Sequence, residues 1–145
     1  KKQQKKVGPS ICLFLKRLWA GDEVMLLDDI KDYLEQNDIG TFGADLFIGQ
    51  LPPSPDDCIA IFEYAGEPPD GEYPGLQVMC RGKKYPTARA KIEQVKNVLH
   101  GVTEETINGT RYLLIRARQS PETLGKDENG RQLFVINFRV IKEVG

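Results

Sequence analysis

The sequence predicts an α+β domain, with a mainly antiparallel sheet and two helices packed on one face, in the order α-β-β-β-α-β-β-β. Two stretches carry apolar residues at three- and four-residue spacing, and six shorter segments alternate or run continuously apolar. The Asn108-Gly109 pair between two of these segments is a strong hairpin signal. With 145 residues and 40% hydrophobic content, the chain can bury one core.

The first predicted helix runs from Met25 to Asn37, because apolar residues recur there at helical spacing and Gly40 follows as a stop signal. Three extended segments come next, at residues 45–50, 58–65 and 75–81. The first is short and ends at a proline-rich loop. The second is apolar on almost every residue, which favours a central strand. The third alternates, which predicts a strand with one wetter face.

The second predicted helix is the clearest element. A proline suits its first turn, and Gly101 suits its C-terminal cap. Its buried face is expected to consist of Ala88, Ile92, Val95 and Leu99.

The predicted hairpin follows, with strands at residues 104–107 and 110–119. Alternation in the longer strand places Tyr112 on one face with Leu114 and Arg116. Residues 120–131 are polar and are predicted to form a loop, and residues 133–141 form the last predicted strand.

The N-terminal segment differs from the rest in charge. Residues 1–21 carry six Lys or Arg and no acid, so the net charge of −1 leaves −7 for the remainder. We expect residues 1–24 to be an extension outside the native fold and residues 25–145 to form a single domain starting at Met25. No stretch approaches the roughly 20 apolar residues of a membrane span. The acidic body argues against a nucleic-acid-binding domain.

The chain offers no catalytic or metal-binding constellation, so we predict no enzyme, no cofactor and no metal. His100 is the only histidine, and its place in the last helical turn suits contact with the free helix carbonyls. The motif Asp127-x-Asn129-Gly130 lacks the full ligand spacing of a calcium loop and indicates an Asx turn.

The cysteines favour a reducing compartment, because three thiols without C-x-x-C spacing leave an odd one. Cys58 and Cys80 lie in apolar runs, where we expect small buried hydrophobes.

Short motifs recur over most of the chain. They are Tyr33-Leu34 with Ile39-Gly40, Asp45–Gly49, Tyr73–Val78, Arg81-Gly82-Lys83, Leu99-His100-Gly101, Asn108-Gly109, Gln119-Ser120-Pro121 and Gly125–Arg131. With these motifs, residues from about Leu26 to Val140 resemble the bacteriophage minor capsid proteins that act as tail terminator or tail completion proteins.

The resemblance implies a structural virion protein of a long-tailed phage. Such a protein forms a ring, commonly of six subunits, at the head-proximal end of the tail tube, where it stops tube growth and joins the tail to the head. The implied partners are further copies of the chain, the tail tube protein and a head completion or connector protein. DNA is expected to pass through without specific binding. Assembly is expected in the host bacterial cytoplasm.

Two alternatives stay open at this point. One is another head–tail connector or minor capsid component, and the other is a small ligand-binding domain of similar fold.

A ring subunit needs two different patches, one for each neighbour. Aromatic and long apolar side chains are enriched at such interfaces, although each is also compatible with partial burial in its own subunit. A Pro/Gly loop at residues 66–75 is a further candidate, since its prolines limit the entropy lost on ordering. The candidate contact residues are Tyr64, Pro68, Pro69, Asp70, Tyr73, Met79, Tyr85 and Tyr112.

Overall fold

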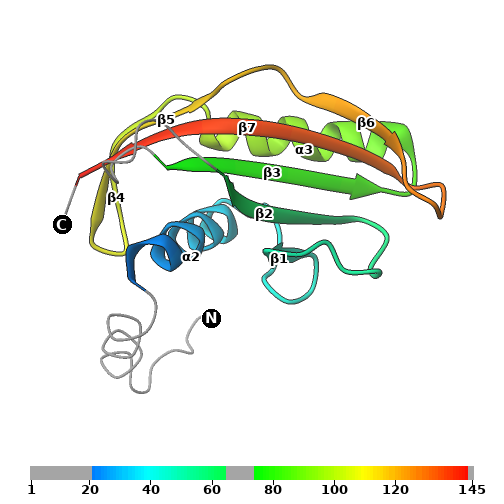
Figure 1. Cartoon of the computed structure of the whole chain (residues 1–145), viewed down its shortest axis with the longest axis horizontal. Coiled ribbons are helices and arrows are strands. Elements are labelled where there is room, and N and C mark those ends of the chain that lie inside the picture. The colour runs from blue at the N-terminus through cyan, green and yellow to red at the C-terminus, as the bar shows by residue number, and fades with distance from the viewer. Residues whose placement is uncertain (1–20, 65–73, 144–145) are drawn as a thin grey trace.

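The structure is a computed structural model that describes residues 21–64 and 74–143. It contains two helices and a curled, mixed sheet, which confirms the α+β class (Figure 1). The described elements are α2 (Gly21–Gln36), β1 (Leu46–Ile48), β2 (Cys58–Tyr64), β3 (Gly75–Gly82), α3 (Tyr85–Leu99), β4 (Val102–Ile107), β5 (Thr110–Ala117), β6 (Glu122–Lys126) and β7 (Gln132–Lys142).

The sheet has the strand order β1-β2-β3-β7-β5-β4, and β6 pairs with the first part of β7. All of these pairs are antiparallel except β1 with β2, which is parallel. The sheet is therefore mainly antiparallel, as predicted, but the parallel β1–β2 pair makes it mixed.

Two elements differ from those predicted. Helix α2 begins at Gly21, before the predicted Met25, and the segment 120–131 contains strand β6 instead of being only a loop. All five residues of β6 are exposed, so no alternation of buried residues marks this strand in the sequence.

One core joins the sheet to both helices. In β3 and β7 every second residue is buried, and the register places Val78 opposite Ile136 and Cys80 opposite Phe134. Leu26, Ile30 and Leu34 of α2 belong to this core. The buried residues of α3 are those predicted from its spacing, Ala88, Ile92, Val95 and Leu99.

Helix α3 approaches the sheet closely at one glycine. A Cβ atom added to Gly82 would lie 2.9 Å from both Cβ and the backbone nitrogen of Ala88. Any larger residue would thus push the first turn of α3 away from β3. The helix ends as predicted, because Gly101 has a φ of +90°.

The β4–β5 hairpin turns at Asn108-Gly109, as predicted. Both residues have positive φ, 52° and 85°, as a two-residue type I′ turn requires. Beyond the turn the β5–β7 register shifts between Tyr112 and Leu114. The shift corrects the predicted alternation, because Tyr112 joins Ile115 in the core and does not share a face with Leu114.

None of the helices in residues 21–64 and 74–143 is both long and apolar enough to cross a membrane.

Candidate functional site

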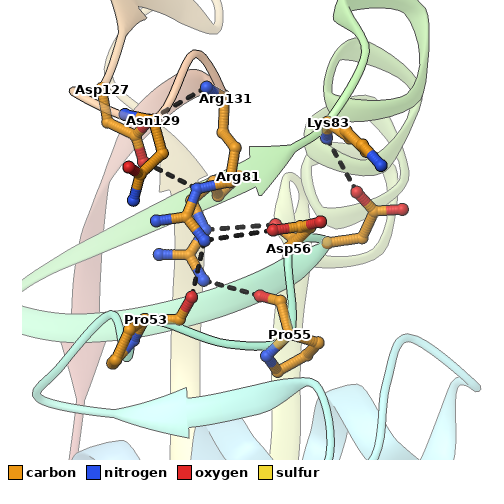
Figure 2. Close-up of polar contacts among 9 residues, drawn as sticks. Pro53, Pro55, Asp56, Arg81, Lys83, Asp127, Asn129 and Arg131 are labelled. Carbon is orange, nitrogen blue, oxygen red and sulfur yellow. Dashed lines mark hydrogen bonds and ion pairs between the residues drawn. The ribbon is translucent and has the colours of Figure 1, made fainter.

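The most constrained polar cluster lies at one end of the sheet, where the loop between β1 and β2 meets the β6–β7 turn (Figure 2). The loop is stiffened by Pro52, Pro53 and Pro55. Two arginines hold it, Arg81 near the end of β3 and Arg131 just before β7, and they are only 3% and 8% exposed.

Arg131 connects the loop to the β6–β7 turn. Its Nη1 donates to the Pro53 carbonyl at 2.6 Å and to Asp56 Oδ1 at 3.2 Å, and its Nε donates to Asp127 Oδ2 at 2.9 Å. The planar guanidinium supplies donors in several fixed directions, which a lysine ammonium could not copy.

Asp127 organises the turn itself, as an Asx turn like the one predicted. Its Oδ1 accepts the backbone N–H groups of Asn129 and Arg131, each at 2.9 Å. These bonds, the one from Arg131 first, and the neighbouring guanidinium lower the pKa of Asp127 below its ordinary value. The Asp127 carboxylate therefore bonds to groups of its own turn.

Arg81 holds the other side of the loop through backbone carbonyls. Its Nη2 donates to the Pro55 carbonyl at 2.6 Å and its Nε to the Asp56 carbonyl at 3.1 Å. The Lys83 backbone N–H donates to Asp57 Oδ1 at 2.8 Å, which ties the loop to the chain entering α3.

These bonds build a fixed, solvent-facing surface from three separate segments. We call it the end surface and define it as residues 53–57, 83–85 and 127–130; all of them are exposed except Asp127, which is half-buried. Every fully buried side-chain N or O atom in the described part of the chain has a hydrogen-bond partner. A surface held in this way loses little conformational entropy when a partner docks.

A second polar cluster joins helix α2 to the β4–β5 hairpin. The carboxylate of Asp29 is 1% exposed. It accepts the Tyr112 hydroxyl at 2.6 Å and Asn108 Nδ2 at 3.0 Å, and Asn108 also donates to Asp32 at 2.7 Å. Burial raises the pKa of Asp29, and the bonds from Tyr112 and Asn108 oppose that rise. Burial likewise raises the pKa of the Tyr112 hydroxyl.

The predicted contact residues differ in exposure and lie at different ends of β3. Tyr85 is 49% exposed and packs edge-to-face on Phe134, with ring centroids 5.2 Å apart. Tyr64 and Met79 are half-buried. Tyr64 lies beside Gly75 at the start of β3, whereas Tyr85 follows the end of that strand.

The prediction for Tyr112 is wrong, because this side chain is fully buried. Pro68, Pro69, Asp70 and Tyr73 lie outside the described residues. Two exposed apolar side chains were missed, Phe42 at 48% and Leu124 at 49%.

His100 has a different role from the predicted one. Its Nδ1 accepts the backbone N–H of Ala117 at 2.9 Å, so the ring receives a hydrogen bond instead of donating one to helix carbonyls. Cys58 and Cys80 are buried, as predicted, and burial raises the pKa of both thiols. Within residues 21–64 and 74–143, no group of three His, Cys, Asp or Glu side chains could hold a metal ion.

A family model described as "Bacteriophage tail terminator protein" matches residues 33–144. A chain in a solved structure of the virion of a native gene transfer agent particle has a similar fold, with a TM-score of 0.54 at 14% identity over 70% of this chain and 81% of that chain. No curated protein matches the chain in sequence.

Proposed function

Because the chain belongs to the bacteriophage tail terminator family, we propose that it forms a ring at the head-proximal end of a long tail tube. There it ends tube growth and joins the tail to the head connector. The observation that carries the proposal is the family match, which extends from α2 to beyond the end of β7 and so covers nearly the whole described fold. The coarser role, a structural protein of a phage-type tail, follows from family membership itself.

The architecture supports a passive structural role. The polar side chains of the two clusters bind one another and backbone groups, so they hold segments in place. The end surface presents fixed loops of the kind that a tail tube or head connector subunit can dock on. Tyr64, Met79 and Tyr85 remain proposed contact residues, and Pro68, Pro69, Asp70 and Tyr73 are proposed on the sequence alone.

The ring is proposed to close only on a tube. A terminator that polymerised before the tube reached its length would stop growth too early. Weak subunit contacts become strong when the tube holds several subunits side by side, since each contact then forms at high effective concentration. The dilute protein alone should therefore be monomeric or weakly associated. The net charge of −5 over residues 25–145 suits a ring through which DNA passes without specific binding.

The test is electron microscopy of particles made with and without the chain. Loss of the chain should give tails of irregular, excessive length that lack heads, and supplying the chain from a plasmid should restore sized, headed tails. Tails of normal length without heads would assign the chain to another head–tail connector. Sized and headed tails made without the chain would refute the proposed function.

A further inference from the structure

Two asparagines of the chain, Asn108 and Asn129, are each followed by a glycine. A glycine has no side chain to hinder its backbone nitrogen, so it leaves the preceding asparagine open to attack. In this reaction the glycine nitrogen bonds to Cγ of the asparagine and the Cγ–Nδ2 bond breaks. The side-chain nitrogen leaves as ammonia with the proton that the glycine gives up. Water then opens the succinimide ring at either carbonyl and yields aspartate or isoaspartate.

The fold holds the side chain of Asn108. Its Nδ2 donates to Asp29 Oδ1 at 3.0 Å and to Asp32 Oδ2 at 2.7 Å, so two carboxylates of α2 bind the group that would leave. Asp29 is itself 1% exposed and accepts the Tyr112 hydroxyl. Cγ can turn toward the Gly109 nitrogen only after the side chain has left both carboxylates.

Asn129 lies in the exposed turn between β6 and β7, beside Asp127 (Figure 2). Among the described residues it is bonded only through its backbone N–H, which donates to Asp127 Oδ1 at 2.9 Å. The Gly130 N–H, which would attack, donates to the Asp127 carbonyl at 3.0 Å. Strand β6 beside the turn consists of exposed residues, so the turn can open without uncovering the core.

The two turns differ in what must break before the ring can close. At Asn129 it is one bond between neutral backbone groups, whereas at Asn108 it is two bonds to carboxylates, one of them buried. Hydrogen bonds to charged groups are about twice as strong as those between neutral groups. The Asn108 side chain should therefore be free to react less often than that of Asn129, by on the order of tenfold or more.

Isoaspartate at position 129 changes the turn that fixes the end surface. Its main chain runs through the former side chain and is longer by one carbon, between the N–H groups of residues 129 and 131 that Asp127 Oδ1 accepts. The carboxylate cannot keep both bonds after this lengthening. Arg131 also donates from Nε to Asp127 and from Nη1 to the Pro53 carbonyl, so the change reaches the β1–β2 loop.

We propose that Asn129 is a site of spontaneous deamidation in the folded protein, and that isoaspartate there loosens the β1–β2 loop. The carboxylates of α2 protect Asn108 from the same reaction. The chemistry needs only water and the folded chain, so it does not depend on the proposed function. Because Asn129 lies on the end surface, subunits that wait before assembly lose the fixed form of that surface.

Peptide mapping by mass spectrometry tests the choice of site. The full chain is incubated at mildly alkaline pH with and without urea. In buffer, Asn129 should be converted at least about tenfold faster than Asn108, whereas in urea the two rates should become similar. Asp32→Ala, checked for a wild-type melting curve, should speed conversion of Asn108 and leave Asn129 unchanged. Equal rates in the folded protein, or a difference that persists in urea, would overturn the proposal.

Hydrogen exchange tests the consequence. The isoaspartate form is separated from aged protein by ion exchange, and its amides in residues 50–57 should exchange faster than in fresh protein while β2 and β3 stay protected. Asn129→Asp adds the same charge without the additional carbon and should exchange like wild type. Asn129→Gln, aged in parallel, controls for other damage. Unchanged exchange in the isoaspartate form, or equal loosening in either variant, would refute the link to the loop.

Discussion

Removal of one hydroxyl tests how α2 is fastened to the β4–β5 hairpin. In Tyr112→Phe the Asp29 carboxylate keeps its bond from Asn108 and loses the 2.6 Å bond from the Tyr112 hydroxyl. A hydrogen bond to a charged group contributes about 1.5 to 3 kcal/mol. We therefore expect the free energy of unfolding to fall by about 2 kcal/mol at neutral pH, which lowers the melting temperature of a domain of this size by about 4 to 8 °C.

The loss should depend on pH in a defined direction. Because burial raises the pKa of Asp29, the folded state takes up a proton at higher pH than the unfolded state. Stability from this group therefore rises as pH falls through the folded pKa of Asp29 toward its ordinary value. The Tyr112 bond favours ionised Asp29, so Tyr112→Phe should raise that pKa further, and the stability gap between variant and wild type should shrink over the same pH range.

Urea unfolding at a series of pH values measures both effects, and NMR titration of the Asp29 carboxyl measures the pKa. Tyr85→Phe is the matched control, since Tyr85 is 49% exposed and its hydroxyl leaves no buried acceptor behind. In an Asp29→Asn background the cost of Tyr112→Phe should drop by about 1 kcal/mol or more, as the acceptor is then neutral. Equal losses for Tyr112→Phe and Tyr85→Phe, or a gap that stays constant on acidification, would refute this account.

Three further substitutions test other parts of the fold. Ile92→Asp places a charge in the core and should unfold the domain in a melting experiment, at a cost of about 4 kcal/mol or more, whereas the exposed Gln94→Asp on the same helix should melt normally. Gly82→Ala should lower the free energy of unfolding, measured by urea, by about 1 to 3 kcal/mol, because the new methyl meets Ala88, and adding Ala88→Gly should recover part of the loss; a wild-type urea midpoint would contradict the close approach. Arg131→Lys keeps the positive charge but loses the several fixed donors of the guanidinium, so amide hydrogen exchange should speed up in residues 50–57 while β2 and β3 stay protected. Equal acceleration of exchange throughout the domain would argue against a local role for Arg131 in holding the loop.

Elements whose signals lie within a few residues were predictable. The buried face of α3 follows from the spacing of Ala88, Ile92 and Val95, and the hairpin follows from Asn108-Gly109, whose positive φ values few other residue pairs accept. These features depend on local geometry, so a single sequence contains the information that fixes them.

Features set by strand register were not predictable. Tyr112 is buried because a register shift in β5 interrupts the alternation, and the bulge has no local sequence mark. Strand β6 was not predicted because its residues are all exposed and give no alternating pattern. The parallel direction of β1 depends on the path of the loop between β1 and β2. In each case the deciding interaction joins segments that are distant in the sequence.

The same limit explains why the end surface emerges only from the fold. Nothing in the sequence distinguishes Arg81 and Arg131 from surface cations, yet both are buried and hold the β1–β2 loop at the end of the sheet. Arg81 and Arg131 are thus used in internal bonds that fix the β1–β2 loop. Reversing the charge of Arg81 or Arg131 would release this loop, so a change in assembly could not be separated from a change in fold.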